Sequence, residues 1–257
     1  MSRLEEALSE RNGRALLGLS IYSYDPVFVE LIGHLGFNAL WIEMEHGPMT
    51  LAEAGDLCRI ASGLGLVTML RIADTRRENV LKSAELAPDI LDVPMVNSPE
   101  SAADLVRHAR YSPEGDRGFF GISRAMRYGV VANNIGDERR RVNESLTLMV
   151  QVETVEAVRR AQEICSVPGI AAIFLGPGDL SVSLGVVGET RHPKVVDSME
   201  RTVRVAKEKG KRVAMACAPS DVSRWEQMGV DLLFCGGNIA CLRLGAEMIR
   251  EQALRVL

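Results

Sequence analysis

Eight short apolar segments recur along the chain, and each has the length of a β-strand. They are nearly continuous runs and do not alternate between apolar and polar residues, which is typical of parallel strands covered on both faces. The predicted strands are residues 15–21, 39–44, 66–72, 89–96, 146–153, 169–176, 212–218 and 230–236. The pattern therefore predicts a sheet of eight parallel strands.

Segments with helical periodicity lie between these strands, and several begin with a residue that can cap a helix. Two of these residues precede a proline, and one takes part in a capping-box pattern with Glu53. The predicted starts are Asp25, Thr50, Asp74, Ser98 and Thr154. Glycines near the predicted helix ends suit a left-handed cap, at Gly63, Gly210 and Gly229.

Strand and helix alternate eight times without a Pro/Gly/Ser-rich linker or an internal repeat. This alternation predicts an α/β fold, and eight units favour a closed (β/α)₈ TIM barrel that forms a single domain over residues 1–257. The stretch 97–145 is longer than one crossover. We expect a helix there, followed by the glycine-rich segment GDRGFFGISRA as a lid or an oligomer contact.

Composition and charge narrow the function classes. The chain is 47% hydrophobic with a net charge of −4, which argues against a nucleic-acid-binding surface. No apolar run approaches the roughly 18–20 residues of a membrane span, and the N-terminal segment lacks the apolar centre of a secretory signal. Five cysteines without a C-x-x-C pair indicate buried thiols in a reducing compartment. We therefore expect a cytoplasmic protein with no membrane and no nucleic-acid partner.

Polar residues stand at the carboxyl ends of five consecutive predicted strands. In a (β/α)₈ barrel these ends meet at one mouth, which is where catalytic residues lie. The residues are Glu43, Glu45, His46, Arg71, Pro94, Gln151, Glu153 and Asp179. We expect them to form one site.

Two of these carboxylates, Glu153 and Asp179, come from neighbouring strands. Oxygen-only ligation with open positions suits a hard divalent cation such as Mg²⁺ or Mn²⁺. A carboxylate at a strand end can equally be a helix cap or an ion-pair partner. Their position at the shared mouth favours the metal interpretation.

His46 is the only one of four histidines that combines a mouth position with adjacent acids, which makes it the candidate proton-transfer group. Arg71 either pairs with Glu43 or Glu45, or offers a permanent cation to a substrate carboxylate or a developing enolate. The glycines of GPGDLS (176–181) expose backbone N–H groups that suit a carboxylate.

Several spaced motifs, in order, resemble those of the HpcH/HpaI aldolase family, the metal-dependent class II pyruvate aldolases. The resemblance spans about residues 5–255. The motifs are EMEHGP (43–48), LRIAD (70–74), DVPMVNSPESA (92–102), ARYSPEGDRG (109–118), VQVET (150–154) and FLGPGDLS (174–181).

The resemblance implies that Glu153 and Asp179 bind a divalent metal, Mg²⁺, Mn²⁺ or Co²⁺. Pyruvate or another 2-oxo acid would chelate that metal through its carboxylate and keto oxygens. The backbone around Gly178 and Asp179 would hold the carboxylate, and Gln151 would line the site.

The resemblance further implies that Arg71 stabilises the enolate and that His46 is the base. Two positions depart from the family pattern. Glu43 stands where the family usually has Asp at the start of D-x-E-H, and Glu85 stands where it usually has an Asp that orients the histidine. Both changes keep the charge, so we expect a pocket rebuilt around longer acids, with Glu43 as an alternative acid–base group.

Family members resemble one another in forming hexamers, as trimers of dimers, with an exchanged C-terminal helix. Residues 241–257 form an amphipathic pattern that could supply this helix. The implied activity is cleavage of a 4-hydroxy-2-oxo acid to pyruvate, or a related 2-oxo acid, and an aldehyde through an enolate held at the metal. Two alternatives stay open: another donor or electrophile, as in citrate-synthase-like or acyl-thioester chemistry, and a non-catalytic 2-oxo-acid binder.

Overall fold

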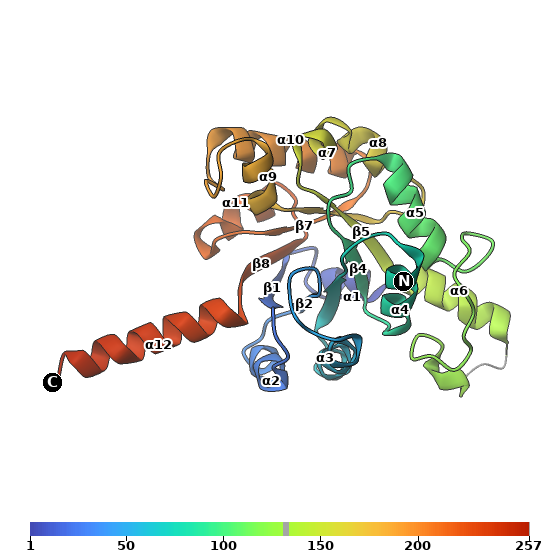
Figure 1. Ribbon diagram of the computed structural model, residues 1–257, viewed down its shortest axis with the longest axis horizontal. Coiled ribbons are helices and arrows are strands. Elements are labelled where there is room, and N and C mark those ends of the chain that lie inside the picture. The colour runs from blue at the N-terminus through green and yellow to red at the C-terminus, as the bar shows by residue number, and fades with distance from the viewer. Residues whose placement is uncertain (131–133, 257) are drawn as a thin grey trace.

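Eight parallel strands close into a barrel in the order β1 to β8, with helices around the outside (Figure 1). The computed structural model describes residues 1–130 and 134–256. Residues 131–133 of the long segment 97–145, and Leu257 at the end of the predicted last helix, lie outside the described residues. The predicted TIM barrel is confirmed.

All eight predicted strands are present, each within a few residues of its predicted range. They are β1 Leu16–Ile21, β2 Ala39–Glu43, β3 Val67–Arg71, β4 Ile90–Val93, β5 Thr147–Val152, β6 Ala172–Leu175, β7 Arg212–Ala216 and β8 Leu232–Gly237. Nearly every residue of β1 to β6 is buried, as expected for strands covered on both faces.

The helices alternate with the strands. The longer ones are α1 Arg3–Glu10, α2 Pro26–His34, α3 Leu51–Gly63, α4 Arg77–Glu85, α5 Pro99–Ala109, α6 Ile135–Ser145, α10 Pro193–Glu208 and α12 Asn238–Leu254. The short ones are α7 Val155–Arg159, α8 Ala161–Cys165, α9 Pro177–Ser183, α11 Val222–Gln227, and the 3₁₀ turns η1 Arg127–Gly129 and η2 Pro219–Asp221. None of the helices described is long and apolar enough to cross a membrane.

Four of the five predicted helix starts are confirmed. The side chains of Asp25, Thr50, Ser98 and Thr154 each accept a hydrogen bond from a backbone N–H in the first turn. The prediction at Asp74 is wrong, because α4 begins at Arg77. Asp74 instead accepts from the backbone N–H of Arg76 at 2.9 Å, a local turn that competes with helix formation.

The left-handed residue after α3 lies two residues later than the predicted Gly63. Gly63 is the last residue of α3, and Gly65 carries the positive φ of 76°. Gly210 and Gly229 have φ values of 68° and 90°, so the left-handed conformation predicted there is confirmed.

The core has an inner and an outer layer. The inner layer fills the barrel and includes an aromatic trio in which the Trp41 ring centroid lies 4.9 Å from that of Phe174 and 5.4 Å from that of Phe234. The apolar face of α1, through Leu4 and Leu8, packs on the same layer and closes the amino-terminal end of the barrel. The opposite end, at the carboxyl ends of the strands, remains for the site.

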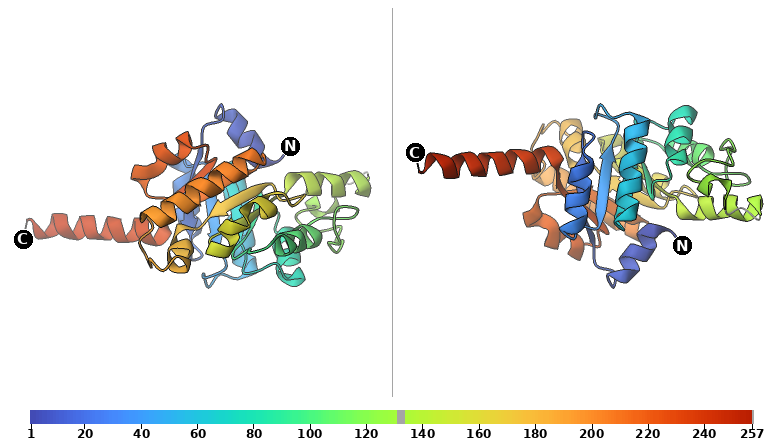
Figure 2. Two further views of the ribbon diagram at one scale, coloured as in Figure 1. Left: turned by 90° about the horizontal axis from the view of Figure 1, so that it is seen from above. Right: turned by 90° about the horizontal axis from the view of Figure 1, so that it is seen from below.

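α12 extends away from the barrel in both views of Figure 2. Asn238, its first residue, is its only buried residue among those the structure describes. The predicted exchange of this helix between subunits stays a prediction.

Candidate active site

A polar layer lies immediately above the apolar filling of the barrel. Glu43, Arg71 and Asp92 are register partners on β2, β3 and β4. Each stands two residues after an inward-facing apolar residue of the same strand, and alternate residues of a strand share a face. All three are buried. The register therefore stacks two carboxyl groups and a guanidinium side by side inside the barrel mouth.

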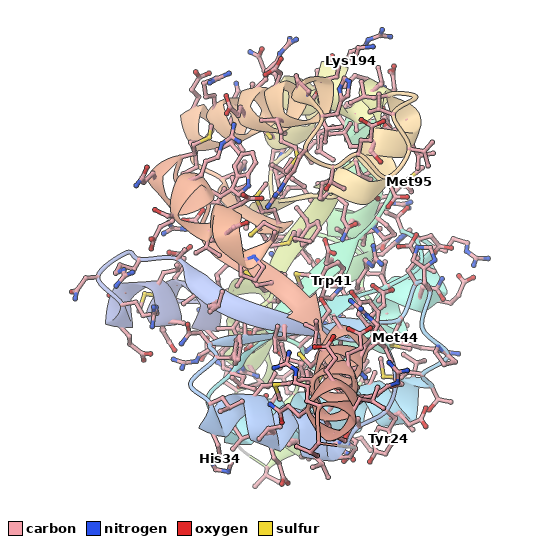
Figure 3. All side chains as sticks on the ribbon, turned by 90° about the vertical axis from the view of Figure 1, so that its left-hand side faces the viewer. Tyr24, His34, Trp41, Met44, Met95 and Lys194 are labelled. Carbon is pink, nitrogen blue, oxygen red and sulfur yellow. The ribbon has the colours of Figure 1, made fainter. Side chains whose placement is uncertain are left out.

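Arg71 is held on several sides. Its Nε and Nη2 donate to Oε2 of Glu43, and its Nη1 lies 3.0 Å from Oε2 of Glu45. The guanidinium carbon lies 4.9 Å from the ring centroid of Trp41, which Figure 3 labels near the middle of the molecule. The side chain is only 9% exposed, so it forms a rigid cation at the floor of the mouth.

Glu43 uses both of its carboxylate oxygens inside the protein. Oε1 accepts from the backbone N–H groups of Glu45 at 2.7 Å and His46 at 3.0 Å, and Oε2 accepts from Arg71. The turn that follows requires glycine, because a Cβ at Gly47 would lie 2.5 Å from the carbonyl oxygen of Glu43. Glu43 is fully buried, so it shapes the turn and anchors Arg71 without facing the mouth.

His46 faces outward from this turn. Its side chain is 69% exposed, and Nε2 lies 3.5 Å from Oε2 of Glu45. The same Glu45 oxygen contacts Arg71, so Glu45 connects the exposed imidazole to the buried guanidinium. Burial raises the pKa of Glu45, against the lowering effect of Arg71 and His46.

Glu85 does not join this group within the chain. Its Oε1 lies 2.9 Å from Nη2 of the buried Arg117. Over residues 1–130 and 134–256, no hydrogen bond or ion pair connects Glu85 with His46. Glu85 is the last residue of α4 and lines a cavity together with Phe119 and Phe120.

Gln151, on β5, is fully buried and contacts Arg71; that it lines the substrate site stays a prediction. Its Oε1 accepts from Nη1 of Arg71 at 3.3 Å, and its Nε2 donates to Oδ2 of Asp92. Sequence reasoning overlooked Asp92. The available signal was an acid inside the otherwise apolar run ILDV (90–93).

Glu153 follows β5 and points its carboxyl group inward with 1% exposure. Oε1 accepts from the backbone N–H of Met95 at 2.7 Å, and Met95 adopts a left-handed φ of 56°. Oε2 has no hydrogen-bond partner among the described residues. Burial raises the pKa of Glu153 to about 7, and the nearby Asp179 carboxylate adds to the effect.

The surroundings of Glu153 fit a cation. A Cβ at Gly176 would lie only 2.3 Å from Oε2 of Glu153, so glycine keeps the space at this oxygen open. Asp179, in the first turn of α9, is exposed and supplies a second carboxylate. A buried carboxyl oxygen without a partner, next to a second acid, is the donor set that a hard divalent cation takes.

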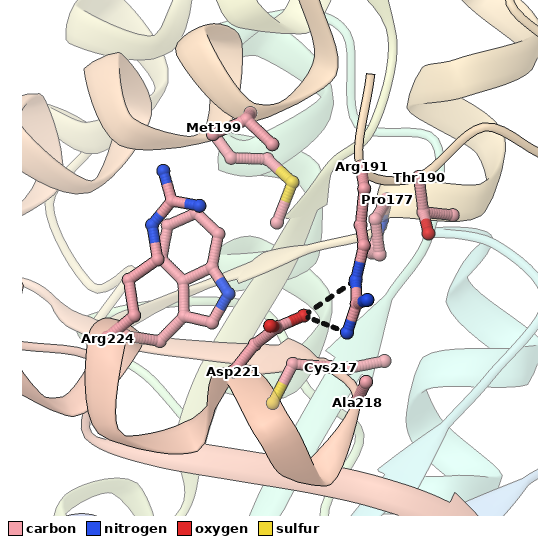
Figure 4. A pocket seen from close by; sticks show the side chains of 11 residues that line it. Pro177, Thr190, Arg191, Met199, Cys217, Ala218, Asp221 and Arg224 are labelled. Carbon is pink, nitrogen blue, oxygen red and sulfur yellow. Dashed lines mark hydrogen bonds and ion pairs between the residues drawn. The ribbon is translucent and has the colours of Figure 1, made fainter. Parts of the chain in front are cut away.

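Two adjoining cavities open beside the polar layer. The first, of about 230 Å³, is lined by Trp41, Tyr22 and Phe234. The second, of about 140 Å³, contains the ion pair between Arg191 and Asp221, with Nη2 and Oδ2 3.0 Å apart (Figure 4). Pro177, Thr190 and Cys217 line both, so the space continues from the floor of the mouth toward an exposed arginine.

A family model described as HpcH/HpaI aldolase/citrate lyase matches residues 17–232. The chain belongs to this family. One relative is a hydroxypyruvate/pyruvate aldolase of Chromohalobacter salexigens. It is 32% identical to this chain over 219 residues, which cover 84% of this chain and 85% of the relative. A 2-keto-3-deoxy-L-rhamnonate aldolase of Escherichia coli is 30% identical over 215 residues, covering 83% and 79%.

Similar solved structures include an HpcH/HpaI aldolase from Desulfitobacterium hafniense. It superposes with a TM-score of 0.89 at 27% identity, covering 97% of this chain and 96% of that one. The family predicted from the motifs is confirmed.

Proposed function

We propose that this aldolase is a class II, divalent-metal-dependent enzyme. It cleaves a 4-hydroxy-2-oxo acid into pyruvate, or a closely related 2-oxo acid, and an aldehyde. Membership of the family supports the carbon–carbon lyase activity. The observation that carries the metal dependence is the unpartnered, buried Oε2 of Glu153 beside Asp179 and the open side of Gly176.

Glu153 and Asp179 would hold the cation. Mg²⁺, Mn²⁺ and Co²⁺ are the candidates, because both ligands are carboxylate oxygens. When bound, the cation would act as a Lewis acid toward the keto and carboxylate oxygens of the 2-oxo acid. The backbone N–H groups of Gly178 and Asp179, in the first turn of α9, would receive the substrate carboxylate.

Arg71 would stabilise the negative charge that develops on the keto oxygen. Glu43, Glu45 and Trp41 fix its guanidinium before substrate binds, so little reorganisation accompanies the reaction. Such fixed charges are often the largest single contribution to catalysis. In this proposal Glu43 is a support for Arg71 and not an acid–base group.

His46 would move the proton. In the cleavage direction it takes the proton from the 4-hydroxyl group, the bond between C3 and C4 breaks, and the electron pair remains on the 2-oxo acid as an enolate. A proton then returns to C3. The exposed imidazole, next to Glu45, can reach the mouth and exchange protons with solvent. Glu85 has no part in the proposed reaction within one chain.

We also propose a cytoplasmic homo-oligomer, with a hexamer as the expected form. The support is the apolar surface of α12. Six large apolar side chains of this helix are more than half exposed, and they are Ile239, Leu242, Leu244, Met248, Ile249 and Leu254. Burial of such a surface against another copy would be favourable. All five cysteines are free thiols, which agrees with a reducing compartment.

The experiment that tests the proposal is proton exchange at the methyl group of pyruvate, followed by NMR in D₂O. We expect exchange with Mg²⁺ or Mn²⁺ and none with a chelator. Glu153→Gln keeps the size of the side chain and should abolish exchange, whereas Glu156→Gln on the exposed face of α7 should not change it. Full exchange by Glu153→Gln, or equal exchange in the chelator, would exclude the proposed metal site.

A further inference from the structure

Asp92 is a carboxyl group with no assigned role in the reaction and no exposure to solvent. It lies on β4, next to Arg71 in the register. Oδ2 accepts from Nε2 of Gln151, and Oδ1 has no hydrogen-bond partner among the described residues. A buried acid with an unpartnered oxygen lowers the stability of the folded state, because burial disfavours the charged form.

The contacts of Asp92 define the orientation of the Gln151 amide. A guanidinium can only donate hydrogen bonds, so Arg71 requires the carbonyl oxygen of Gln151 on its side. This leaves the Gln151 Nε2 group facing Asp92, which must accept. Without an acceptor at position 92, Nε2 of Gln151 loses its partner and Arg71 alone opposes a flip of the amide, which would point N–H groups at a cation.

We infer that Asp92 is a positioning residue that acts through Gln151 to hold the Arg71 guanidinium in place for the aldol reaction. The expected effect on the reaction rests on the proposed function, whereas the contacts between Asp92, Gln151 and Arg71 do not depend on it. Arg71 has two further anchors, Glu43 and Glu45, but both contact it from the side of β2. Among the residues that the structure describes, Gln151 is the one side chain of β5 that accepts a hydrogen bond from Arg71, so Gln151 and Asp92 support the guanidinium from the side away from β2.

Asp92 lies among several other charged groups of this layer. Burial raises the pKa of Asp92 well above its ordinary value, against the lowering effect of Arg71 and of the Gln151 hydrogen bond. The nearby Glu153 and Glu43 raise it further. An asparagine at position 92 would keep an oxygen that can accept from Nε2 of Gln151, whereas an apolar residue would offer no acceptor.

The test compares Asp92→Asn, Asp92→Leu and Asp92→Ala, with Ile90→Val as a control for packing damage in the same buried strand. We expect Asp92→Leu and Asp92→Ala to lower kcat for pyruvate proton exchange by about 10–100-fold, as for a displacement of about 1 Å. KM should change little, because Arg71 acts mainly on charge that develops during the reaction. Asp92→Asn should retain kcat within about threefold, and Ile90→Val should retain it fully.

A second measurement does not depend on turnover. The side-chain amide protons of Gln151, followed by NMR of ¹⁵N-labelled protein, should exchange slowly with solvent in the parent and in Asp92→Asn, and faster in Asp92→Leu. An Asp92→Leu protein with parental kcat and parental amide exchange would overturn the inference, and so would an Asp92→Asn protein as impaired as Asp92→Leu. If the parent itself fails to exchange pyruvate protons, the proposed function fails, while the amide measurement still decides the role of Asp92.

Discussion

Replacement of Gly176 by alanine should damage the proposed metal site without removing a ligand. The added Cβ would lie 2.3 Å from Oε2 of Glu153 and 3.0 Å from its Cβ. Ordinary contact begins near 3.4 Å. The carboxylate oxygen must therefore retreat by about 1 Å, and Gly176 itself is buried between β6 and α9 with little freedom to move.

A displacement of about 1 Å can cost about 10²-fold in rate. We therefore expect Gly176→Ala to lose about 100-fold in pyruvate proton exchange, with weaker Mn²⁺ binding by calorimetry. Overpacking should also lower the free energy of unfolding by about 1–3 kcal/mol. Gly63→Ala is the matched control, because a Cβ there meets nothing within 4 Å and its φ is not positive. Parental Mn²⁺ affinity and exchange rate in Gly176→Ala would refute the reasoning.

Two further predictions concern charged groups at different depths. Arg71→Lys keeps the charge but loses the planar guanidinium that contacts both Glu43 and Glu45, so kcat for pyruvate proton exchange should fall by about 10²–10³-fold. Steady-state kinetics measures this, and a change confined to KM would count against the proposed role of Arg71. Arg127 and Arg141 hold the pKa of Glu138 at about 2. Because this pKa is lowered by folding, the stabilisation is complete above the unfolded value of 4.5 and is lost as the pH falls toward 2. Glu138→Gln should therefore cost about 1–2 kcal/mol of unfolding free energy at neutral pH, after allowance for solvent screening of the arginines, and less at pH 3. A difference that does not change with pH in urea denaturation would contradict it.

The barrel could be predicted from sequence because its signal is repeated. Each strand is a short apolar run, each is followed by a helix, and residues such as Asp25 and Thr50 cap those helices as expected. The exact helix starts were harder to predict, because the same side chain can either cap a helix or close a local turn. Asp74 has the side chain of a helix cap, but it closes a turn on Arg76 instead, and only the three-dimensional path of the chain decides between these uses.

The sequence could predict a site residue only where its position along a strand was enough to place it at the mouth of the barrel. Glu153, Asp179 and Arg71 stand at strand ends, where a (β/α)₈ barrel gathers its functional groups. Asp92 was overlooked because its contact with Gln151 depends on the register between β4 and β5. The depth of each side chain was equally hidden, since Glu43 and His46 are three residues apart yet one is fully buried and the other exposed.

The most direct test of the proposed active site is a crystal structure of the protein with Mn²⁺ and pyruvate, with the cation located by its anomalous scattering. We predict one Mn²⁺ bound by Oε2 of Glu153 and the carboxylate of Asp179, with pyruvate next to it and its keto oxygen facing Arg71. A cation bound elsewhere, with Glu153 unligated in the presence of pyruvate, would contradict the proposal.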